Sequence, residues 1–298
     1  LSTLKAFWDR NPACLEAKEP ALAWYRHTLK ADWSSPAELK HDIRTASILK
    51  DGRAAGWPPL LRHQVIALIF ERPSTRTRVS FVSGIERLGG SAMVLSPADM
   101  QLGRGETIED TAKVLGRMAE AIVLRTGPHE TLLELDRHAG VPVVNGLTYE
   151  HHPCQALADA QTLRERFGDL RGLRVAYLGD GNNVCVSLMI VGALTGMRVT
   201  AACPAAYRPP AEVVAWADAA GRERGGGAAV VDDPREAVAG ARALYADTWV
   251  SMGDEETAEA RRRDLGPYRL DDALLDAAAP GAVALHCLPA HAGDETTA

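Results

Sequence analysis

The chain has 298 residues, of which 46% are hydrophobic and 24% are charged, so its composition is that of an ordinary globular protein and not of a disordered or collagen-like one. Its length predicts about two domains, and no apolar run approaches the roughly 18 residues that a membrane-spanning helix needs. The formal net charge of -6 argues against a protein that binds nucleic acid.

Cysteine usage favours a reducing compartment. The chain has five cysteines, an odd number, and no two of them form a Cys-x-x-Cys pair. We therefore expect neither a disulfide framework nor a zinc ribbon. The N-terminus lacks the basic-then-apolar pattern of a signal peptide, although a removed leader stays open because the chain begins with Leu1 and not with Met. A cytoplasmic protein is the expectation.

The first predicted element is a helix near the N-terminus. Residues 1–26 show no sustained period and form an extension that we do not place. Ser35 suits the capping position of a helix, and Pro36 suits its first position. We expect this helix to run to about Lys50, because Gly52 suits a helix end.

Apolar segments of strand length then alternate with segments at helical spacing. The alternation predicts strands at 65–70, 91–95, 121–125 and 141–145, and helices at 77–88, 107–118 and 130–138. Strands that alternate with helices of this length predict a parallel sheet covered on both faces.

The same alternation restarts near residue 150. It predicts helices at 153–167, 184–194 and 211–220, and strands at 174–178, 198–203, 228–231, 243–246 and 282–286. Two α/β halves, 1–150 and 151–298, are the simplest account, and each would be a doubly wound parallel-sheet domain. Ligands of such folds bind at the carboxyl ends of the strands, so the loops at those ends are the candidate sites.

The sharpest candidate is the loop Ser74-Thr75-Arg76-Thr77-Arg78, which follows the first strand and begins a helix. Backbone N–H groups, three hydroxyl groups and two guanidinium groups converge there, and phosphate is the obvious ligand for such an anion site. The alternative is a capped helix whose arginines are solvated. The sequence has no Walker A loop, so a nucleoside triphosphate is not the expected ligand.

Three other segments carry weaker signals. The Gly-Asp-Gly turn at 179–181 begins like a dinucleotide fingerprint, but Val184 occupies the third glycine position and the fingerprint fails. In the His-Pro-Cys-Gln segment at 152–155, the histidine and the glutamine can donate hydrogen bonds to a carbonyl oxygen at a helix N-terminus; a capping histidine is the alternative. Arg125 closes a strand, where a functional arginine would stand, but a structural role is as good an interpretation.

Two more segments follow strands of the second half. In the Asp-Thr-Trp-Val-Ser-Met-Gly segment at 247–253, the carboxylate can hold an ammonium group and Ser251 can bond a carboxylate; the alternative is a polar surface loop. The His-Cys-Leu-Pro segment at 286–289 places Cys287 beside a histidine, which could suggest a thiol nucleophile. Adjacency in the sequence does not supply that geometry, so a buried structural thiol is the simpler interpretation.

Taken in order, these segments resemble the aspartate/ornithine carbamoyltransferase family. The Ser-Thr-Arg-Thr motif at 74–77 and the His-Pro-x-Gln motif at 152–155 are shared across the family, whereas Ser-Met-Gly at 251–253 and His-Cys-Leu-Pro at 286–289 point to its ornithine branch. The resemblance covers about residue 27 to the C-terminus. It implies a carbamoyl phosphate domain, an ornithine domain, and transfer of a carbamoyl group from carbamoyl phosphate to the δ-amine of L-ornithine, giving citrulline and phosphate.

The resemblance also implies roles for individual residues. The implied catalytic residues are Arg125, His152, Gln155 and Cys287. The residues implied to bind carbamoyl phosphate are Ser74, Thr75, Arg76, Thr77, Gln101, Arg125, His152, Gln155, Cys287 and Leu288. Those implied to bind ornithine are Asn183, Asp247, Ser251 and Met252.

Assembly and setting follow from the same resemblance. Gln101 matches a residue that reaches into a neighbouring subunit's site, which implies a homotrimer or a multiple of trimers. No metal, organic cofactor, nucleic acid or membrane partner is implied, and the setting would be cytoplasmic arginine metabolism.

Some positions depart from the family pattern. The sequence stops at Ala298 without the family's C-terminal Glu-Asn-Arg segment, Val186 replaces a usual histidine, and Ala292 stands where many bacterial relatives carry arginine. These departures keep open a competing interpretation, in which the chain is a non-catalytic carbamoyltransferase-like subunit with a role in binding or assembly.

Overall fold

The computed structural model describes residues 39, 43–44, 46–47, 49–50, 56–98, 100–101, 105–250 and 255–297. The chain divides into two compact units between Cys154 and Gln155. Each unit has a parallel β-sheet with helices on both faces, which confirms the predicted fold class. Every described residue between 39 and 50 is helical, as expected, whereas the predicted helix start at Ser35 and the extension at 1–26 lie outside the described residues.

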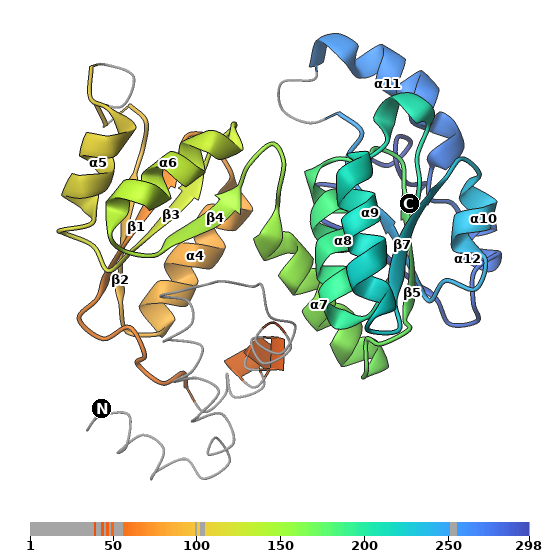
Figure 1. Cartoon of the computed structure of the whole chain (residues 1–298), viewed down its shortest axis with the longest axis horizontal. Coiled ribbons are helices and arrows are strands. Elements are labelled where there is room, and N and C mark those ends of the chain that lie inside the picture. Colours follow the sequence, from red (N-terminus) through yellow and green to blue (C-terminus); the bar gives the residue numbers. More distant parts are fainter. Residues whose placement is uncertain are drawn as a thin grey trace. The chain divides into compact units, whose positions relative to one another are not determined.

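The first unit contains a four-stranded sheet in the order β2-β1-β3-β4 (Figure 1). Its elements are β1 (Val65–Phe70), α4 (Thr75–Arg87), β2 (Ser91–Leu95), α5 (Ile108–Leu115), β3 (Ala121–Arg125), α6 (His129–Ala139) and β4 (Val143–Leu147). Neighbouring strands are parallel throughout. The predicted alternation of strands and helices is therefore confirmed in this unit.

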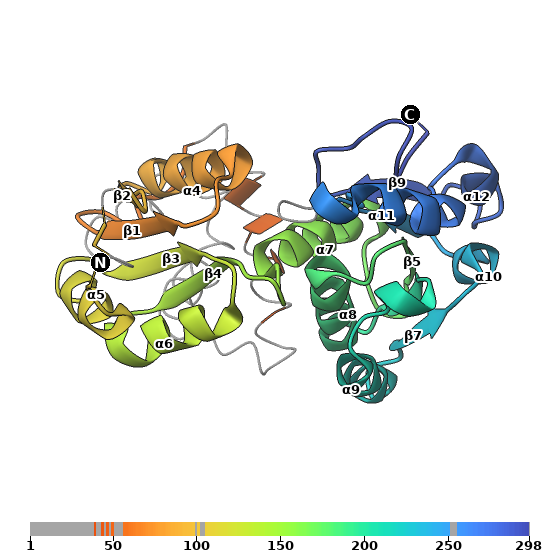
Figure 2. The same ribbon diagram turned by 90° about the horizontal axis from the view of Figure 1, so that it is seen from above.

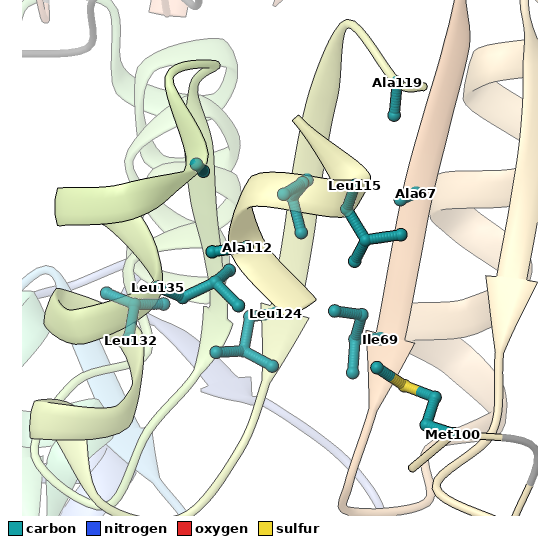
Figure 3. Packing of buried hydrophobic residues seen from close by; sticks show 11 residues of the cluster. Ala67, Ile69, Met100, Ala112, Leu115, Ala119, Leu124, Leu132 and Leu135 are labelled. Atoms are coloured by element: carbon teal, nitrogen blue, oxygen red, sulfur yellow. The ribbon is translucent and has the colours of Figure 1, made fainter. Parts of the chain in front are cut away.

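Side chains of β1 alternate between two separate cores, as the pleat of a strand requires. Ile66, Leu68 and Phe70 pack on the side of α4, whereas Ala67 and Ile69 pack on the side of α5 and α6. Figure 2 shows α4 on one side of the sheet and α5 and α6 on the other. Figure 3 shows the second of these cores, in which side chains of α5 and α6 face β1 and β3.

The last strand of this sheet lies two residues later than the sequence pattern predicted. The pattern placed it at 141–145, but β4 spans Val143–Leu147. Proline has no N–H group to donate to the strand ladder, and Pro142 instead accepts a hydrogen bond from Ile122 N at 2.9 Å just before the strand begins. The shift places Leu147 opposite Arg125, so both strands reach the same edge together.

The second unit contains a five-stranded parallel sheet in the order β7-β6-β5-β8-β9. Its strands are β5 (Arg174–Leu178), β6 (Arg198–Ala202), β7 (Gly227–Val231), β8 (Ala243–Ala246) and β9 (Val283–His286). Its longer helices are α7 (Pro153–Phe167), α8 (Asn183–Thr195) and α9 (Ala211–Arg222). All eight of these elements were predicted.

Six further short elements of the second unit were not predicted. They are η3 (Ala205–Tyr207), α10 (Pro234–Val238), η4 (Glu255–Thr257), α11 (Ala258–Leu265), η5 (Gly266–Tyr268) and α12 (Asp272–Asp276). Five of them have only three or five residues, too few for an apolar period to be recognised. The sixth, α11, has eight residues, but Leu265 is its only large apolar residue. Figure 2 shows α10 and α12 on the side of β5 that lies opposite α8.

In each sheet, the register of the strands brings the candidate loops together at the carboxyl-terminal ends of the strands. Phe70 pairs with Arg125 at the ends of β1 and β3. Leu178 pairs with Ala246, and Ala246 pairs with His286, at the ends of β5, β8 and β9. The next residues along the chain are those singled out from the sequence.

Candidate active site

The anion loop of the first unit, residues 74–78, begins a capped helix and exposes hydrogen-bond donors. Ser74 is the N-cap of α4, and its hydroxyl oxygen accepts a hydrogen bond from Thr77 N at 3.3 Å. The first turn carries no acidic residue, and the side chains of Thr75 and Arg76 are exposed. The partial positive charge of the helix N-terminus is therefore supplemented by hydroxyl and guanidinium donors, which suits a phosphate group.

Hydrogen bonds to the end of the neighbouring strand hold this loop in place. Glu71 N donates to the carbonyl oxygen of Arg125 at 3.0 Å, and the hydroxyl of Thr126 donates to the Glu71 carboxylate. Arg72 donates to the hydroxyl of Tyr149 at 2.7 Å and lies over its ring. The loop and the end of β3 are thus fixed relative to each other.

Arg125 is a buried charge at the end of β3. It is 8% exposed, and among the described residues no group accepts a hydrogen bond from its Nε. Burial, and then the nearby charge of Arg72, lower its pKa, but a guanidinium group remains protonated in proteins. A buried donor without a protein partner is costly, so its placement favours an anionic ligand.

His152, another of the implied catalytic residues, is uncharged at neutral pH. Burial, and then the charge of Arg125, lower the pKa of His152 to about 4. At neutral pH its imidazole therefore has one donor nitrogen and one acceptor nitrogen. His152 lies close enough to Arg125 for the charge of Arg125 to affect its pKa. A positive charge and a neutral donor are therefore available to the same ligand.

Gln155 is arranged differently from what the sequence suggested. Its Nε2 donates to Asp159 Oδ1 at 2.9 Å, one turn along α7. The amide nitrogen expected to grip a carbonyl oxygen is thus engaged with a carboxylate. Cys154, between these motif residues, donates to the carbonyl oxygen of Asn145, and burial raises the pKa of its thiol to about 11.

Asp247 is the centre of the candidate site in the second unit. It follows β8 and is 5% exposed. Asn182 Nδ2 donates to its Oδ2 at 2.7 Å, and Thr248 N donates to its Oδ1 at 2.7 Å. The Cys287 thiol also donates to Oδ1. Three neutral donors therefore orient this buried carboxylate, which suits it to hold an ammonium group.

Cys287 acts here as a hydrogen-bond donor. Burial, and then the charge of Asp247, raise the pKa of its thiol well above the usual range. A nucleophilic cysteine needs a lowered pKa, so the geometry favours the structural interpretation over the nucleophile. The hydrogen bond to Asp247 is the contact that the structure shows for the Cys287 thiol.

The loop after β9 is held by a buried glutamate. Glu295 is 1% exposed, and its Oε1 accepts hydrogen bonds from His286 Nε2 at 3.1 Å and from His291 N at 2.6 Å. Leu288 N donates to His286 Nδ1 at 2.8 Å. Leu288 has a φ of 60°, a conformation that is strained for leucine, and its side chain is 53% exposed.

Asp247, His286 and Cys287 each have an atom that could bind a metal ion, and these three atoms lie within 4.8 Å of one another. Hydrogen bonds already engage both nitrogens of His286 and the thiol of Cys287. We therefore assign the three side chains to the hydrogen-bonded framework of the loop ends.

Four of the predicted residues are not placed in a site by the structure. Ser251 and Met252 lie outside the described residues. Gln101 is exposed, next to residues 102–104, which are also outside the described part of the chain. Asn183 opens α8, and its carbonyl oxygen accepts a hydrogen bond from Ser187.

Three residues of the second unit were missed in the sequence. Asn182, the residue before Asn183, donates to Asp247 and caps α8 through its side-chain oxygen. Arg261 donates to Asp180 at 2.6 Å and to the carbonyl oxygen of Trp249 at 3.3 Å. Asp159 could have been found, because glutamine and aspartate four residues apart on a helix face each other. The Asp180–Arg261 pair joins segments 81 residues apart, so no local spacing indicates it.

None of the described helices combines the length and the apolar character required to cross a bilayer.

Two family models together match most of the chain. Residues 26–165 match the carbamoyl-P binding domain of aspartate/ornithine carbamoyltransferase. Residues 171–298 match the Asp/Orn binding domain of the same family.

Individual relatives agree with these models. An ornithine carbamoyltransferase of Acidothermus cellulolyticus is 53% identical over 92% of this chain and 87% of its own length. An anabolic ornithine carbamoyltransferase of Pseudomonas aeruginosa is 47% identical over 91% of this chain and 87% of its own. The solved ornithine carbamoyltransferase of Pyrococcus furiosus superposes with a TM-score of 0.85 at 44% identity, covering 88% of this chain and 84% of that one.

Proposed function

The chain belongs to the aspartate/ornithine carbamoyltransferase family, and from that premise we propose which of its residues carry the reaction. It is an enzyme that transfers the carbamoyl group of carbamoyl phosphate to the δ-amine of L-ornithine, giving citrulline and phosphate. Nothing among these relatives supports the alternative of a non-catalytic binding or assembly subunit. We propose residues 1–150 as the carbamoyl phosphate domain and 151–298 as the ornithine domain.

The phosphate of carbamoyl phosphate binds at the start of α4. Ser74, Thr75, Arg76 and Thr77 supply hydroxyl, guanidinium and backbone N–H donors there. Charge-assisted bonds of this kind are about twice as strong as neutral ones. Gln101, Cys287 and Leu288 complete the proposed set.

Arg125 and His152 stabilise the charge that develops during the reaction. Attack of the δ-amine on the carbamoyl carbon forms a tetrahedral oxyanion, from which phosphate leaves. The single observation that carries this assignment is the buried Nε of Arg125, which lacks a protein partner among the described residues and lies near the neutral His152. Preorganised donors aimed at such an oxyanion are usually the largest catalytic effect.

Ornithine binds in the second unit through its α-amino and α-carboxylate groups. The buried carboxylate of Asp247 holds the α-ammonium group, and Asn183, Ser251 and Met252 complete the proposed contacts. With both α-groups held, the δ-amine is the group left to attack. That amine must lose a proton, and the departing phosphate is the proposed acceptor, because none of these motif residues is an evident general base.

Replacement of Arg125 by glutamine tests the oxyanion assignment. Loss of one such donor lowers kcat by about 10² to 10³, and we expect the KM for ornithine to stay within twofold. Arg125→Lys is the matched variant, since it keeps the charge but not the fork of donors. Citrulline formation measured over a range of both substrates gives these constants, and an unchanged kcat in Arg125→Gln would remove Arg125 from the mechanism.

Assembly and setting complete the proposal. We assign the enzyme to a homotrimer or a multiple of trimers, with Gln101 serving a neighbouring copy, and to cytoplasmic arginine metabolism. The match of Gln101 to a family residue that reaches into a neighbouring subunit's site supports the assignment of a trimer.

A further inference from the structure

A buried carboxylate holds the side chain of Gln155, and the mechanism above does not use it. Asp159 lies one turn along α7 and is 6% exposed. Its Oδ1 accepts a hydrogen bond from Gln155 Nε2 at 2.9 Å, and its Oδ2 accepts one from the hydroxyl of Tyr245 at 2.9 Å. Each oxygen of the carboxylate thus faces a different element, α7 or β8.

The carboxylate selects one of two orientations of the Gln155 amide. An ionised carboxylate only accepts hydrogen bonds, whereas a primary amide has a donor nitrogen and an acceptor oxygen. Nε2 must therefore face Asp159, and Oε1 turns away from it. The atom that Gln155 offers on its far side is an acceptor, which suits an amino group better than a carbonyl oxygen.

Tyr245 keeps the carboxylate from rotating. Its side chain is fully buried and its ring stacks on that of Tyr177, with the centroids 5.6 Å apart. The hydroxyl position is thereby fixed, and Oδ2 of Asp159 is bonded to it. The orientation imposed on Gln155 is consequently anchored in the core of the second unit.

We propose that Asp159 is a positioning residue that holds Gln155 Oε1 as an acceptor for the amino group of the carbamoyl moiety, and so makes the site selective for carbamoyl over acyl phosphates. The inference rests on the proposed function and on the contact between Gln155 and carbamoyl phosphate that the family resemblance implies. Acetyl phosphate is the informative comparison, because a methyl group replaces the amino group. A site built to bond an N–H group rejects an analogue that lacks it.

The titration of Asp159 gives the selectivity a pH dependence. Among the residues that the structure describes, the titratable groups that interact with Asp159 are Tyr245, Asp247 and Cys287. Burial, and then the charge of Asp247, raise the pKa of Asp159 to about 7, against the opposing effect of its two hydrogen bonds. Above pH 7 the ionised form fixes the amide. Below pH 7 the protonated form can donate to Oε1, and the amide is free to turn.

Replacement of Asp159 by asparagine is the central test. Asparagine has the same shape and can bond Gln155 and Tyr245 with the amide in either orientation, so the fold is kept and the selection is lost. We expect the ratio of the two Kd values, acetyl phosphate over carbamoyl phosphate, to fall about tenfold at pH 8 by calorimetry. The melting temperature should stay close to that of the parent enzyme. An unchanged ratio would overturn the inference.

A double variant separates this inference from the role of Gln155. If Asp159 acts through Gln155, adding Asp159→Asn to Gln155→Ala changes the ratio no further, whereas full additivity contradicts the inference. Unchanged carbamoyl phosphate binding in Gln155→Ala alone would refute the proposed contact, and the inference with it. If the Kd ratio falls in Gln155→Ala but not in Asp159→Asn, only the positioning role of Asp159 is refuted.

Tyr245→Phe supplies a readout that a purely structural role would not move. The variant removes the donor to Oδ2 but keeps the bond between Asp159 and Gln155. Loss of a hydrogen bond to a carboxylate raises its pKa. The fall of the Kd ratio toward low pH, which we call its acid limb, should therefore begin at a higher pH in this variant. The Kd ratio at pH 9 should stay within twofold of that of the parent enzyme. An acid limb at the same pH as in the parent enzyme would contradict the assignment of that limb to Asp159.

Discussion

Burial decides which side chains of this enzyme carry charge when the substrates bind. His152 is neutral, because burial and the charge of Arg125 lower its pKa to about 4. Cys287 is neutral because burial and the charge of Asp247 raise its pKa. Arg125 keeps its charge. In the proposed mechanism, the developing oxyanion therefore meets one buried cation and one neutral donor, and ornithine meets one oriented carboxylate.

At the residue scale, Arg76 tests the anion loop. Replacing Arg76 by alanine removes a charge-assisted hydrogen bond of roughly 1.5–3 kcal/mol, so the Kd for carbamoyl phosphate should rise about tenfold or more. Ornithine binding should hardly change. Arg87→Ala, at the far end of the same helix, is the control. Calorimetry that finds carbamoyl phosphate affinity unchanged in Arg76→Ala would refute the loop assignment.

The thiol of Cys287 is a second test at this scale. Serine preserves a donor to Asp247, so Cys287→Ser should keep kcat within about threefold, whereas Cys287→Ala leaves a buried carboxylate with one donor fewer. An unmet hydrogen bond costs about 1–3 kcal/mol, and we expect the KM for ornithine to rise about tenfold in the alanine variant. Complete loss of citrulline formation in the serine variant would favour a nucleophilic thiol instead.

At the scale of elements, parallel register explains how distant loops meet. Phe70 and Arg125 are partners, as are Ala246 and His286, so the residues that follow these strands reach a common edge. Apolar alternation in the sequence located all nine strands named in the structure, with β4 displaced by two residues because of Pro142. The alternation of apolar strand segments with helical segments can be recognised locally in the sequence, so the positions of the strand ends can be predicted from it.

Long-range hydrogen bonds could not be predicted in the same way. Asn182 and Asp247 are 65 residues apart, and Tyr245 and Asp159 are 86 residues apart. Nothing in the local sequence indicates that these side chains meet, because the sheet order β7-β6-β5-β8-β9 decides it. The sequence could supply the types of residue at each strand end, but not which of them hold the others in position.

Asn182 tests the junction between α8 and Asp247. Asn182→Ser keeps an oxygen that can cap the helix but loses the donor to Asp247, whereas Asn182→Ala loses both. We expect both variants to raise the KM for ornithine about tenfold, and only the alanine variant to lose the capping contribution of about 1 kcal/mol. Thermal unfolding and steady-state rates separate the two effects. An ornithine KM that rises in Asn182→Ala alone would show that the donor to Asp247 is not needed.

At the scale of the whole molecule, the anion loop at 74–77 and the carboxylate of Asp247 lie at strand ends of different units. The phosphate group of carbamoyl phosphate is assigned to the first of these, and the α-ammonium group of ornithine to the second. Function could be predicted from the sequence because its motifs, taken in order, resemble those of a known family. The orientation of Gln155 could not, because it depends on a carboxylate and a hydroxyl buried in the second unit.

The proposed trimer has its own test. If Gln101 completes a neighbouring site, a mixture of Gln101→Ala and Arg76→Ala chains, reassembled together, contains sites with both residues intact. Each variant alone should be weakly active, and the reassembled mixture should recover a clear fraction of parental activity. Activity equal to the mean of the two separate variants would contradict a shared site.

The choice of amine tests the central claim most directly. Held by both α-groups, ornithine presents only its δ-amine, whereas putrescine lacks the carboxylate and leaves polar groups of the site unpaired at about 1–3 kcal/mol each. At fixed carbamoyl phosphate, kcat/KM should favour ornithine over putrescine by roughly tenfold or more, since about 1.4 kcal/mol is a factor of ten. Aspartate should react poorly, because it has no second amine. Equal or faster carbamoylation of putrescine would contradict the account.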